Sequence, residues 1–147
     1  NSGNQYSDFY ITEEDVAVVI ERAKKDTSPG TDGLQMNFWK RVPLMHCLLA
    51  PLFNAILRSG KLPSSWLESR LVLIPKTEEP NVLNPLDYRP ISITQTVYRI
   101  FMSVLNRKLS KTIKLSPSQK GFREGEGCVE HAFTLQECLD SCRRGSK

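Results

Sequence analysis

Two short apolar runs joined by a long loop constrain this sequence more than any other feature. The runs are Leu71–Ile74 and Ile91–Ile93, and the loop between them is rich in Pro and Asn. Pro75 ends or edges the first run, because proline cannot donate a hydrogen bond to a strand ladder. Pro90 favours an extended backbone for the residue before it. The stretch therefore predicts a small antiparallel β-pair, with Thr77–Tyr88 arching away from its end.

A basic residue stands at each mouth of this loop. Lys76 comes shortly after the first run and Arg89 shortly before the second, so the predicted pairing brings both cations to one end of the hairpin. Loops this long inside a compact domain are usually functional or disordered. The two cations are therefore interpreted as a clamp for an anionic group. The alternative is a set of ion pairs with the loop's own acids, but exposed pairs contribute little free energy. Those acids are Glu78, Glu79 and Asp87.

Composition places the chain among ordinary soluble proteins. Its 147 residues are 39% hydrophobic and 24% charged, which suits a single globular domain. No apolar run approaches the ~20 residues of a membrane span. The N-terminus resembles no signal peptide, and it starts at Asn1 and not at Met. We expect an intracellular protein, cut from a longer chain, with no membrane partner.

Charge is distributed unevenly along the chain. The net charge is +4, whereas residues 1–30 alone carry −3. Residues 99–123 contain no acidic residue and seven basic ones: Arg99, Arg107, Lys108, Lys111, Lys114, Lys120 and Arg123. A segment of one sign attracts polyanions, most commonly nucleic acid. The alternative is a solvated helix face, but such faces usually mix signs.

Apolar periodicity and start and stop signals predict five helices, at residues 12–25, 34–42, 43–60, 94–114 and 128–143. With the β-pair they define an α+β, mostly helical fold. The third helix is expected to bury Leu44, Leu48, Leu49, Leu52, Phe53, Ile56 and Leu57. The fourth is expected to bury Val97, Phe101, Leu105, Leu109 and Ile113, and the fifth Val129, Ala132, Phe133, Leu139 and Cys142.

The loop after the first helix, Ser28–Gly33 (SPGTDG), contains two glycines and a proline within six residues. Such a stretch sets a tight and defined turn. It is either a simple helix–helix connector or a turn that brings backbone N–H groups close to a phosphate or a strand. The sequence leaves both alternatives open.

Four cysteines raise the question of a metal site. Cys128, His131, Cys138 and Cys142 are four possible zinc ligands. Their spacing fits none of the usual paired patterns, and the segment is predicted to be one continuous helix. Reduced thiols, with Cys138 and Cys142 as small apolar residues, are therefore favoured over zinc.

Four motifs occur in order: Ser28–Gly33 (SPGTDG), Leu73–Lys76 (LIPK), Tyr88–Ser92 (YRPIS) and Gln119–Phe122 (QKGF). Together they resemble the N-terminal motifs of reverse transcriptases from non-LTR (LINE-like) retrotransposons, over about residues 12–143. Group II intron maturases share the architecture and remain an alternative, although the motif YRPIS resembles the retrotransposon branch more closely.

The resemblance implies the fingers subdomain of a right-hand polymerase, with the first edge of the palm, over residues 12–147 after an N-terminal extension at 1–11. In that family the residues matching Lys76 and Arg89 contact the triphosphate of the incoming dNTP. This agrees with the clamp interpretation, because the arginine fork suits a phosphate and lysine acts as a point charge. The Ser28–Gly33 loop is expected to shape the side where the template enters, through Ser28, Pro29, Gly30, Asp32 and Gly33. Template and primer contacts are expected from Arg70, Arg107, Lys108, Lys111, Gln119, Lys120, Gly121 and Phe122.

Catalytic carboxylates are the missing part. Phosphoryl transfer by a polymerase needs carboxylates that hold two Mg²⁺ ions, and the family places them on strands beyond residue 147. After Asp87 the only aspartate is Asp140, in a predicted helix. The chain by itself is thus expected to have no catalytic or metal-binding residue and to be inactive, with Mg²⁺ a cofactor of the parent enzyme only.

The expected partners are template RNA, an RNA–DNA duplex and dNTP, and the parent element is expected to act in the nucleus if it is eukaryotic. One alternative is a stand-alone, excised or domesticated, fingers module that binds RNA without catalysing. Another is a structural piece that self-associates through apolar surface facing the absent palm.

Overall fold

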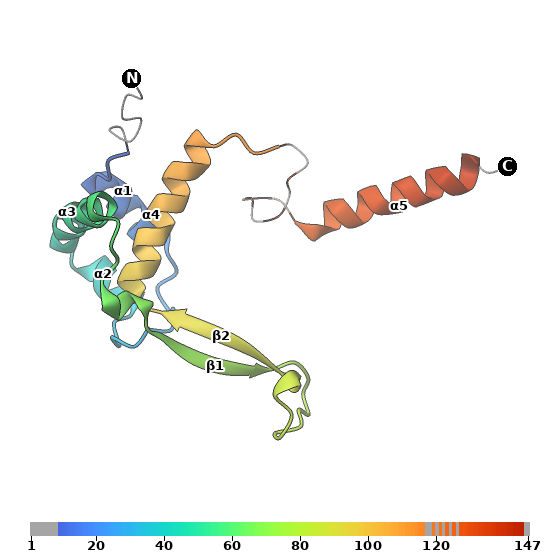
Figure 1. The fold of residues 1–147 in the computed structure, drawn as a ribbon, viewed down its shortest axis with the longest axis horizontal. Helices are drawn as coiled ribbons and strands as arrows, with labels where there is room; N and C mark the ends of the chain where they lie inside the picture. The colour runs from blue at the N-terminus through green and yellow to red at the C-terminus, as the bar shows by residue number, and fades with distance from the viewer. Residues whose placement is uncertain are drawn as a thin grey trace. The chain divides into compact units, whose positions relative to one another are not determined.

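The computed structural model describes residues 9–116, 119, 121, 123, 125 and 127–145. The chain divides into two compact units, residues 1–109 and 110–147. The described elements, in chain order, are α1 (Glu13–Arg22), α2 (Met36–Arg41), α3 (Leu44–Ser59), the 3-10 helix η1 (Ser64–Leu67), β1 (Ser69–Pro75), the 3-10 helix η2 (Pro85–Asp87), β2 (Tyr88–Thr94), α4 (Thr96–Thr112) and α5 (Cys128–Gly145) (Figure 1). The predicted α+β class and the predicted order of elements are confirmed.

Helix α1 starts where its sequence signal predicts. The Thr12 hydroxyl accepts from the Asp15 N–H (3.2 Å), and the Asp15 carboxylate accepts from the Thr12 N–H (3.0 Å), which forms a capping box. The helix ends at Arg22, three residues before the predicted end. Lys40 of α2 donates to the Glu21 carbonyl (2.7 Å), satisfying one of the acceptors that a helix C-terminus leaves unpaired.

Helix α3 is bounded by Pro43, its N-cap, and by Gly60, whose left-handed φ of 63° is a conformation that glycine adopts without strain. Within the helix, the buried Asn54 holds the N-terminal segment in place. Its side chain accepts from the Ile11 N–H (2.9 Å) and donates to the Ile11 carbonyl (2.7 Å), in a pattern like that of a strand ladder.

The hydrophobic core of the first unit lies between α1, α2, α3, η1 and α4. Phe53 is fully buried, and its ring centroid lies 5.0 Å from that of Phe101 and 6.2 Å from that of Trp66. Aromatic contacts at these separations add to the stabilisation from burial. The other buried apolar residues are Ile11, Val16, Ile20, Met36, Trp39, Leu49, Ala50, Ile56, Ile100 and Val104.

Part of the predicted core is wrong. On α3, Leu49, Phe53 and Ile56 are buried, but Leu44, Leu48 and Leu52 are 71%, 62% and 42% exposed. The helix is apolar on nearly all sides, so periodicity alone could not select its inner face.

The core face of α4 also differs from the prediction. The buried residues there are Thr96, Ile100, Phe101 and Val104, with Val97 and Leu105 partly buried, whereas Leu109 and Ile113 are 43% and 52% exposed. The stripe expected at every fourth residue rotates around an α-helix, so its last members leave the buried face.

Helix α5 belongs to the second unit, and its predicted inward face is exposed. Val129, Phe133 and Leu139 are 76%, 66% and 47% exposed, and Cys138 and Cys142 are exposed as well. The spacing therefore predicted the helix correctly but not the burial of these side chains.

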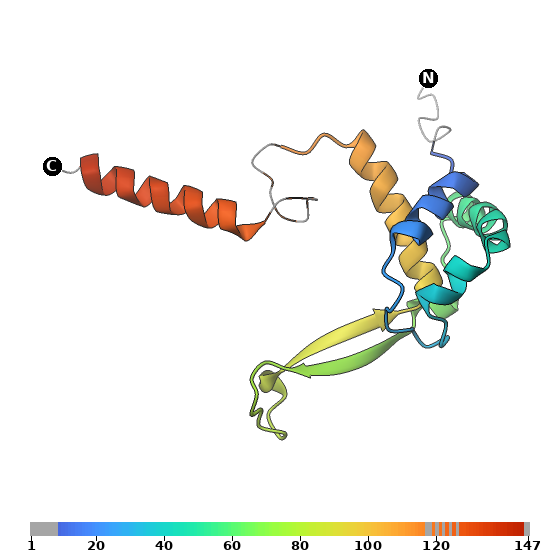
Figure 2. The same cartoon turned by 180° about the vertical axis from the view of Figure 1, so that it is seen from behind.

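Strands β1 and β2 form an antiparallel hairpin that extends away from the helices of the first unit, with its loop at the far end (Figures 1 and 2). The register places Ser69 opposite Thr94 at the root and Pro75 opposite Tyr88 at the end of the strands. Both faces of the hairpin are largely exposed in the described part of the chain. The predicted β-pair, with its loop arching from one end, is confirmed.

Candidate nucleotide and nucleic-acid site

The hairpin register brings Lys76 and Arg89 to one face. Arg89 lies opposite Ile74, and cross-strand partners project to the same side of a sheet. Lys76 follows Ile74 by two residues, and side chains of a strand alternate between faces with a period of two. The ladder reaches Lys76, because its N–H donates to the Asp87 carbonyl (2.8 Å). The two predicted clamp residues therefore lie on one face, at one end of the hairpin.

Arg70 lies on the same face at the root of the hairpin, opposite Ile93. Six residues separate it from Lys76, which corresponds to about 20 Å of strand. The face thus presents cations at both ends, with apolar side chains between them. This arrangement suits an extended anion at least as well as a compact one.

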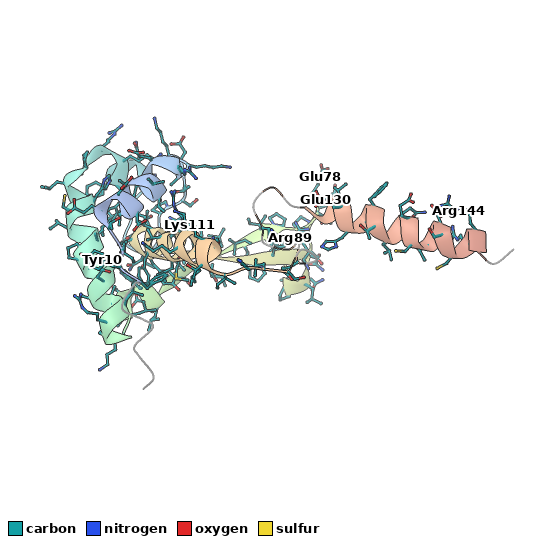
Figure 3. The ribbon with its side chains drawn as sticks, turned by 90° about the horizontal axis from the view of Figure 1, so that it is seen from above. Tyr10, Glu78, Arg89, Lys111, Glu130 and Arg144 are labelled. Atoms are coloured by element: carbon teal, nitrogen blue, oxygen red, sulfur yellow. The ribbon has the colours of Figure 1, made fainter. Side chains whose placement is uncertain are left out.

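The acids of the loop do not neutralise these cations. Lys76 directs its ammonium to the Leu86 carbonyl (2.6 Å), a bond that uses one of the three donors of a lysine. Arg89 is exposed on the hairpin, away from the helical end marked by Tyr10 (Figure 3). The ion pairs found among the described residues join Lys108 to Asp15 and Arg143 to Asp140, and none of them joins a loop acid to Lys76 or Arg89.

The Asp87 carboxylate stabilises the loop through hydrogen bonds. Its carboxylate accepts from the Asn81 N–H (2.9 Å) and from the Asn84 side-chain amide (2.8 Å). The side chains of Asn81 and Asn84 accept in turn from the N–H groups of Leu83 (3.0 Å) and Leu86 (3.2 Å). These Asx turns fix the loop between the two cations. This role of Asp87 was not predicted, although the spacing Asn-x-x-Asn-x-x-Asp is a pattern from which such turns can be predicted.

The Ser28–Gly33 loop packs against the junction of β2 and α4. A Cβ atom on Gly30 would lie 2.6 Å from the Cα of Gln95, so only glycine fits this contact. Two side-chain bonds accompany it: Gln95 donates to the Thr31 hydroxyl (3.3 Å) and Thr96 to the Leu34 carbonyl (2.6 Å). The sequence left two interpretations of this loop open, a simple connector between helices and a turn that lies close to a phosphate or a strand. The structure shows a turn that lies close to the end of a strand.

Two arginines complete the junction. Arg99 donates to the Ser28 carbonyl (2.8 Å) and to the Thr96 hydroxyl (2.9 Å), and Arg70 donates to the Pro29 carbonyl at a longer 3.4 Å. Within the loop, Asp32 accepts from the Leu34 N–H (3.1 Å). Arg99 was predicted only as part of the basic segment. Its position one turn after Thr96 gave no sign of a partner 71 residues earlier in the chain.

The basic residues of α4 have different environments. Lys108 forms an ion pair with Asp15 (2.7 Å), and both side chains are about four-fifths buried. Burial alone raises the pKa of the Asp15 carboxyl, but the hydrogen bonds from Lys108 and Thr12 outweigh it and lower this pKa below its usual value. Arg107 is half-buried, and its Nε has no hydrogen-bond partner among the residues that the structure describes. Lys111 is exposed (Figure 3). Lys111 is therefore the most accessible of the three for a polyanion.

The remaining predicted contacts lie in the second unit. Gln119 donates from its side chain to the Gly121 carbonyl (3.1 Å) and accepts at its own carbonyl from Arg123 (3.2 Å). Lys120 and Phe122 lie outside the described residues. The prediction that this segment contacts template or primer stays a prediction.

Metal and thiol chemistry find little support in the described part of the chain. No group of three or more His, Cys, Asp or Glu residues there is arranged to hold a metal ion. Cys47 donates to the Glu13 carboxylate (3.2 Å), and this bond is the main reason why the Cys47 pKa is raised. Among the described helices none is long and apolar enough to cross a membrane.

Comparison with known proteins identifies the relatives of this chain. The sequence is 34% identical over 129 residues to the retrovirus-related Pol polyprotein from type-2 retrotransposable element R2DM of Drosophila melanogaster, a match over 88% of this chain and 12% of that protein. It is 32% identical over 121 residues to the Pol polyprotein of a type-1 retrotransposable element R2 of Nasonia vitripennis (82% and 11%). A probable RNA-directed DNA polymerase from transposon BS of Drosophila melanogaster is 29% identical over 130 residues (85% and 14%). No protein-family model matches the sequence.

These relatives define a class, the Pol polyproteins and RNA-directed DNA polymerases of mobile elements. Within that class, the chain is homologous over most of its length to part of the reverse transcriptase of non-LTR, LINE-like retrotransposons, which confirms the family that its four motifs predicted. The chain spans about an eighth of the length of the two relatives from Drosophila melanogaster.

Proposed function

We propose that this chain forms the fingers of an RNA-directed DNA polymerase, in which Lys76 and Arg89 hold the triphosphate of the incoming dNTP. The observation that carries this proposal is the placement of both cations on one face, at one end of the hairpin, with no ion pair to an acid among the described residues. Arginine would bind phosphate oxygens through two parallel N–H groups, and lysine would add a mobile point charge.

Template RNA would then run along the same face toward the root of the hairpin. Arg70 lies there, beside the Ser28–Gly33 loop. The homology to reverse transcriptases supports a nucleic-acid partner in general. We expect an RNA–DNA duplex beyond the templating position, and nuclear action of the parent element.

Catalysis needs residues other than these. The described residues contain no set of carboxylates placed for metal binding, so the two Mg²⁺ ions of phosphoryl transfer would be held by other parts of the parent enzyme. What these residues supply is binding and orientation of phosphates. The chain by itself is expected to be inactive.

Arg89→Ala in the intact parent enzyme tests the clamp. Loss of one charge-assisted contact, worth about 1.5–3 kcal/mol, should lower kcat/KM for dNTP roughly 10- to 150-fold while template affinity stays near normal. Lys61→Ala, which removes an exposed cation from the connector before η1, is the matched control and should change neither quantity. Unchanged incorporation by Arg89→Ala would rule out the clamp.

A second candidate is RNA binding by this chain without catalysis, which the seven basic residues and the lack of acidic ones within residues 99–123 favour. RNA affinity should then fall steeply as salt rises, because bound Lys and Arg release counterions. Lys111→Glu should weaken binding and flatten the salt dependence, whereas Lys24→Glu, near the acidic N-terminal part, should not. Equal effects of the two variants would contradict a specific role for the basic segment.

A further inference from the structure

The loop that joins the two strands displays large apolar side chains to solvent. In this hairpin tip (residues 78–87), Val82, Leu83 and Leu86 are 82%, 90% and 76% exposed. Exposed apolar residues are ordinary when they stand alone. Here three of them stand on one loop whose turns are fixed by the side chains of Asn81, Asn84 and Asp87. A surface that is already ordered loses little entropy on binding, so the tip is suited to dock.

A second unpartnered apolar surface lies on the same unit. Leu44, Leu48 and Leu52 recur at every fourth residue of α3 and form one exposed ridge, the α3 outer face. The opposite side of this helix packs into the core through Leu49 and Phe53. A helix that is apolar all round is typical of helices covered on both sides.

The two surfaces carry opposite charges. Glu78 and Glu79 are exposed on the tip, and residues 77–87 contain no basic residue. Two exposed arginines stand near the ends of this ridge in the sequence, Arg41 three residues before Leu44 and Arg58 in the last turn of α3, and Cys47 donates to the Glu13 carboxylate. The acids of the tip disfavour contact with RNA and favour an apolar protein surface with a basic rim.

The α3 outer face is such an apolar surface with basic residues near its ends. The tip cannot reach the α3 outer face of its own chain, so the contact would have to involve a second molecule. Each strand has seven residues, which corresponds to about 23 Å of strand length. Figures 1 and 2 show the tip at the end of the hairpin that points away from the helices of its own unit. We propose that the hairpin tip of one copy of this chain docks on the α3 outer face of a second copy. A reciprocal pair covers both apolar surfaces on both molecules, and it forms a closed dimer.

Sedimentation velocity of the chain over a concentration series tests the pair. We expect a reversible dimer whose Kd rises at least about tenfold in Leu83→Glu and in Leu48→Glu, because each change places a charge at the centre of the contact. Leu139→Glu, on the exposed face of α5, is the matched control and should leave Kd unchanged. Far-UV circular dichroism checks that each variant remains folded.

Charge reversal makes the test specific. The double variant Glu78→Lys with Glu79→Lys and the double variant Arg41→Glu with Arg58→Glu should each fail to dimerise alone. An equimolar mixture should recover the dimer, because both reciprocal contacts regain opposite charges. A chain that stays monomeric at all concentrations, a mixture that does not recover, or a dimer that only Leu139→Glu abolishes would each overturn the proposal.

Discussion

The first unit contains two regions that are built in opposite ways. The helical region buries its aromatic residues against one another, with Phe53 fully enclosed between Trp66 and Phe101. The hairpin buries almost nothing, and it presents its cations and apolar side chains to solvent. The first region therefore provides stability, and the second provides the surface that is available for ligands.

The difference shows how an exposed hairpin keeps a defined direction. Its attachment to the helices does not depend on a hydrophobic core of its own. It depends on the Gly30–Gln95 contact and on two hydrogen bonds, from Thr96 to the Leu34 carbonyl and from Arg99 to the Ser28 carbonyl. Substitutions should thus fall into three groups: those that unfold the helical region, those that loosen the junction, and those that alter function alone.

The largest loss of stability is expected from Phe53→Ala. Removal of a fully buried ring in contact with two other aromatic residues should lower the free energy of unfolding by about 3–5 kcal/mol. Urea denaturation followed by circular dichroism measures this loss. Leu83→Ala at the hairpin tip is the companion variant and should stay within about 0.5 kcal/mol of the parent chain. Similar losses in both variants would contradict the division into two regions.

Gly30→Ala should have the next largest effect. The added methyl group would overlap the backbone at Gln95, and relief of such an overlap typically costs about 1–3 kcal/mol. Gly127→Ala is the matched control, because nothing lies within 4 Å of its added Cβ and its φ is not left-handed. Thermal melts of the two variants compare them directly. Equal melting temperatures would show that the junction tolerates the methyl group.

A smaller, pH-dependent effect is expected from the ion pair between α1 and α4. The Asp15 pKa is lower in the folded chain than its unfolded value near 3.8, so its contribution to stability is complete above that value. The contribution is lost as the pH falls through the folded pKa. Lys108→Met should therefore lower stability by about 1 kcal/mol at pH 7 and by less at pH 2. A difference that is the same at both pH values would exclude the ion pair as its source.

The smallest effect on stability is expected at the clamp. Lys76→Ala and Arg89→Ala should each change the free energy of unfolding by less than about 0.5 kcal/mol, because both side chains are exposed and take part in no ion pair within the described part of the chain. Calorimetry of the purified chain measures this directly. A large loss would show that these cations support the fold, and it would weaken the proposed role in binding phosphate.

Local signals in the sequence predicted the local structure well. Thr12 and Asp15 predicted the start of α1, Gly60 the end of α3, and Pro75 the end of β1. Each of these signals acts through the backbone of its own neighbourhood, so no knowledge of the rest of the fold was needed.

The predictions that were wrong or missing concern residues whose contacts are distant in the sequence. Nothing near Lys108 or Arg99 in the sequence indicates that Asp15 or the Ser28 carbonyl lies beside it. Similarly, the exposed Leu48 has the same local pattern as the buried Leu49, and only the packing of α1 and α4 decides between them. The register placed Lys76 and Arg89 together because the hairpin is local, and for this reason their proximity was easier to predict than the packing of the helical core.

The Gly30–Gln95 contact also bears on the order of folding. Within the hairpin, the residues paired at its root, Ser69 and Thr94, are 25 positions apart, whereas the Thr31–Gln95 bond spans 64. Closing the longer segment costs more chain entropy, and such non-local contacts are slow to form. We expect the two strands to pair early, because they are close in the sequence. The hairpin would take its fixed orientation relative to the helices only when the Ser28–Gly33 loop packs against its root. A newly made chain would then pass through a stage in which both strands are paired while their cations still sample many orientations.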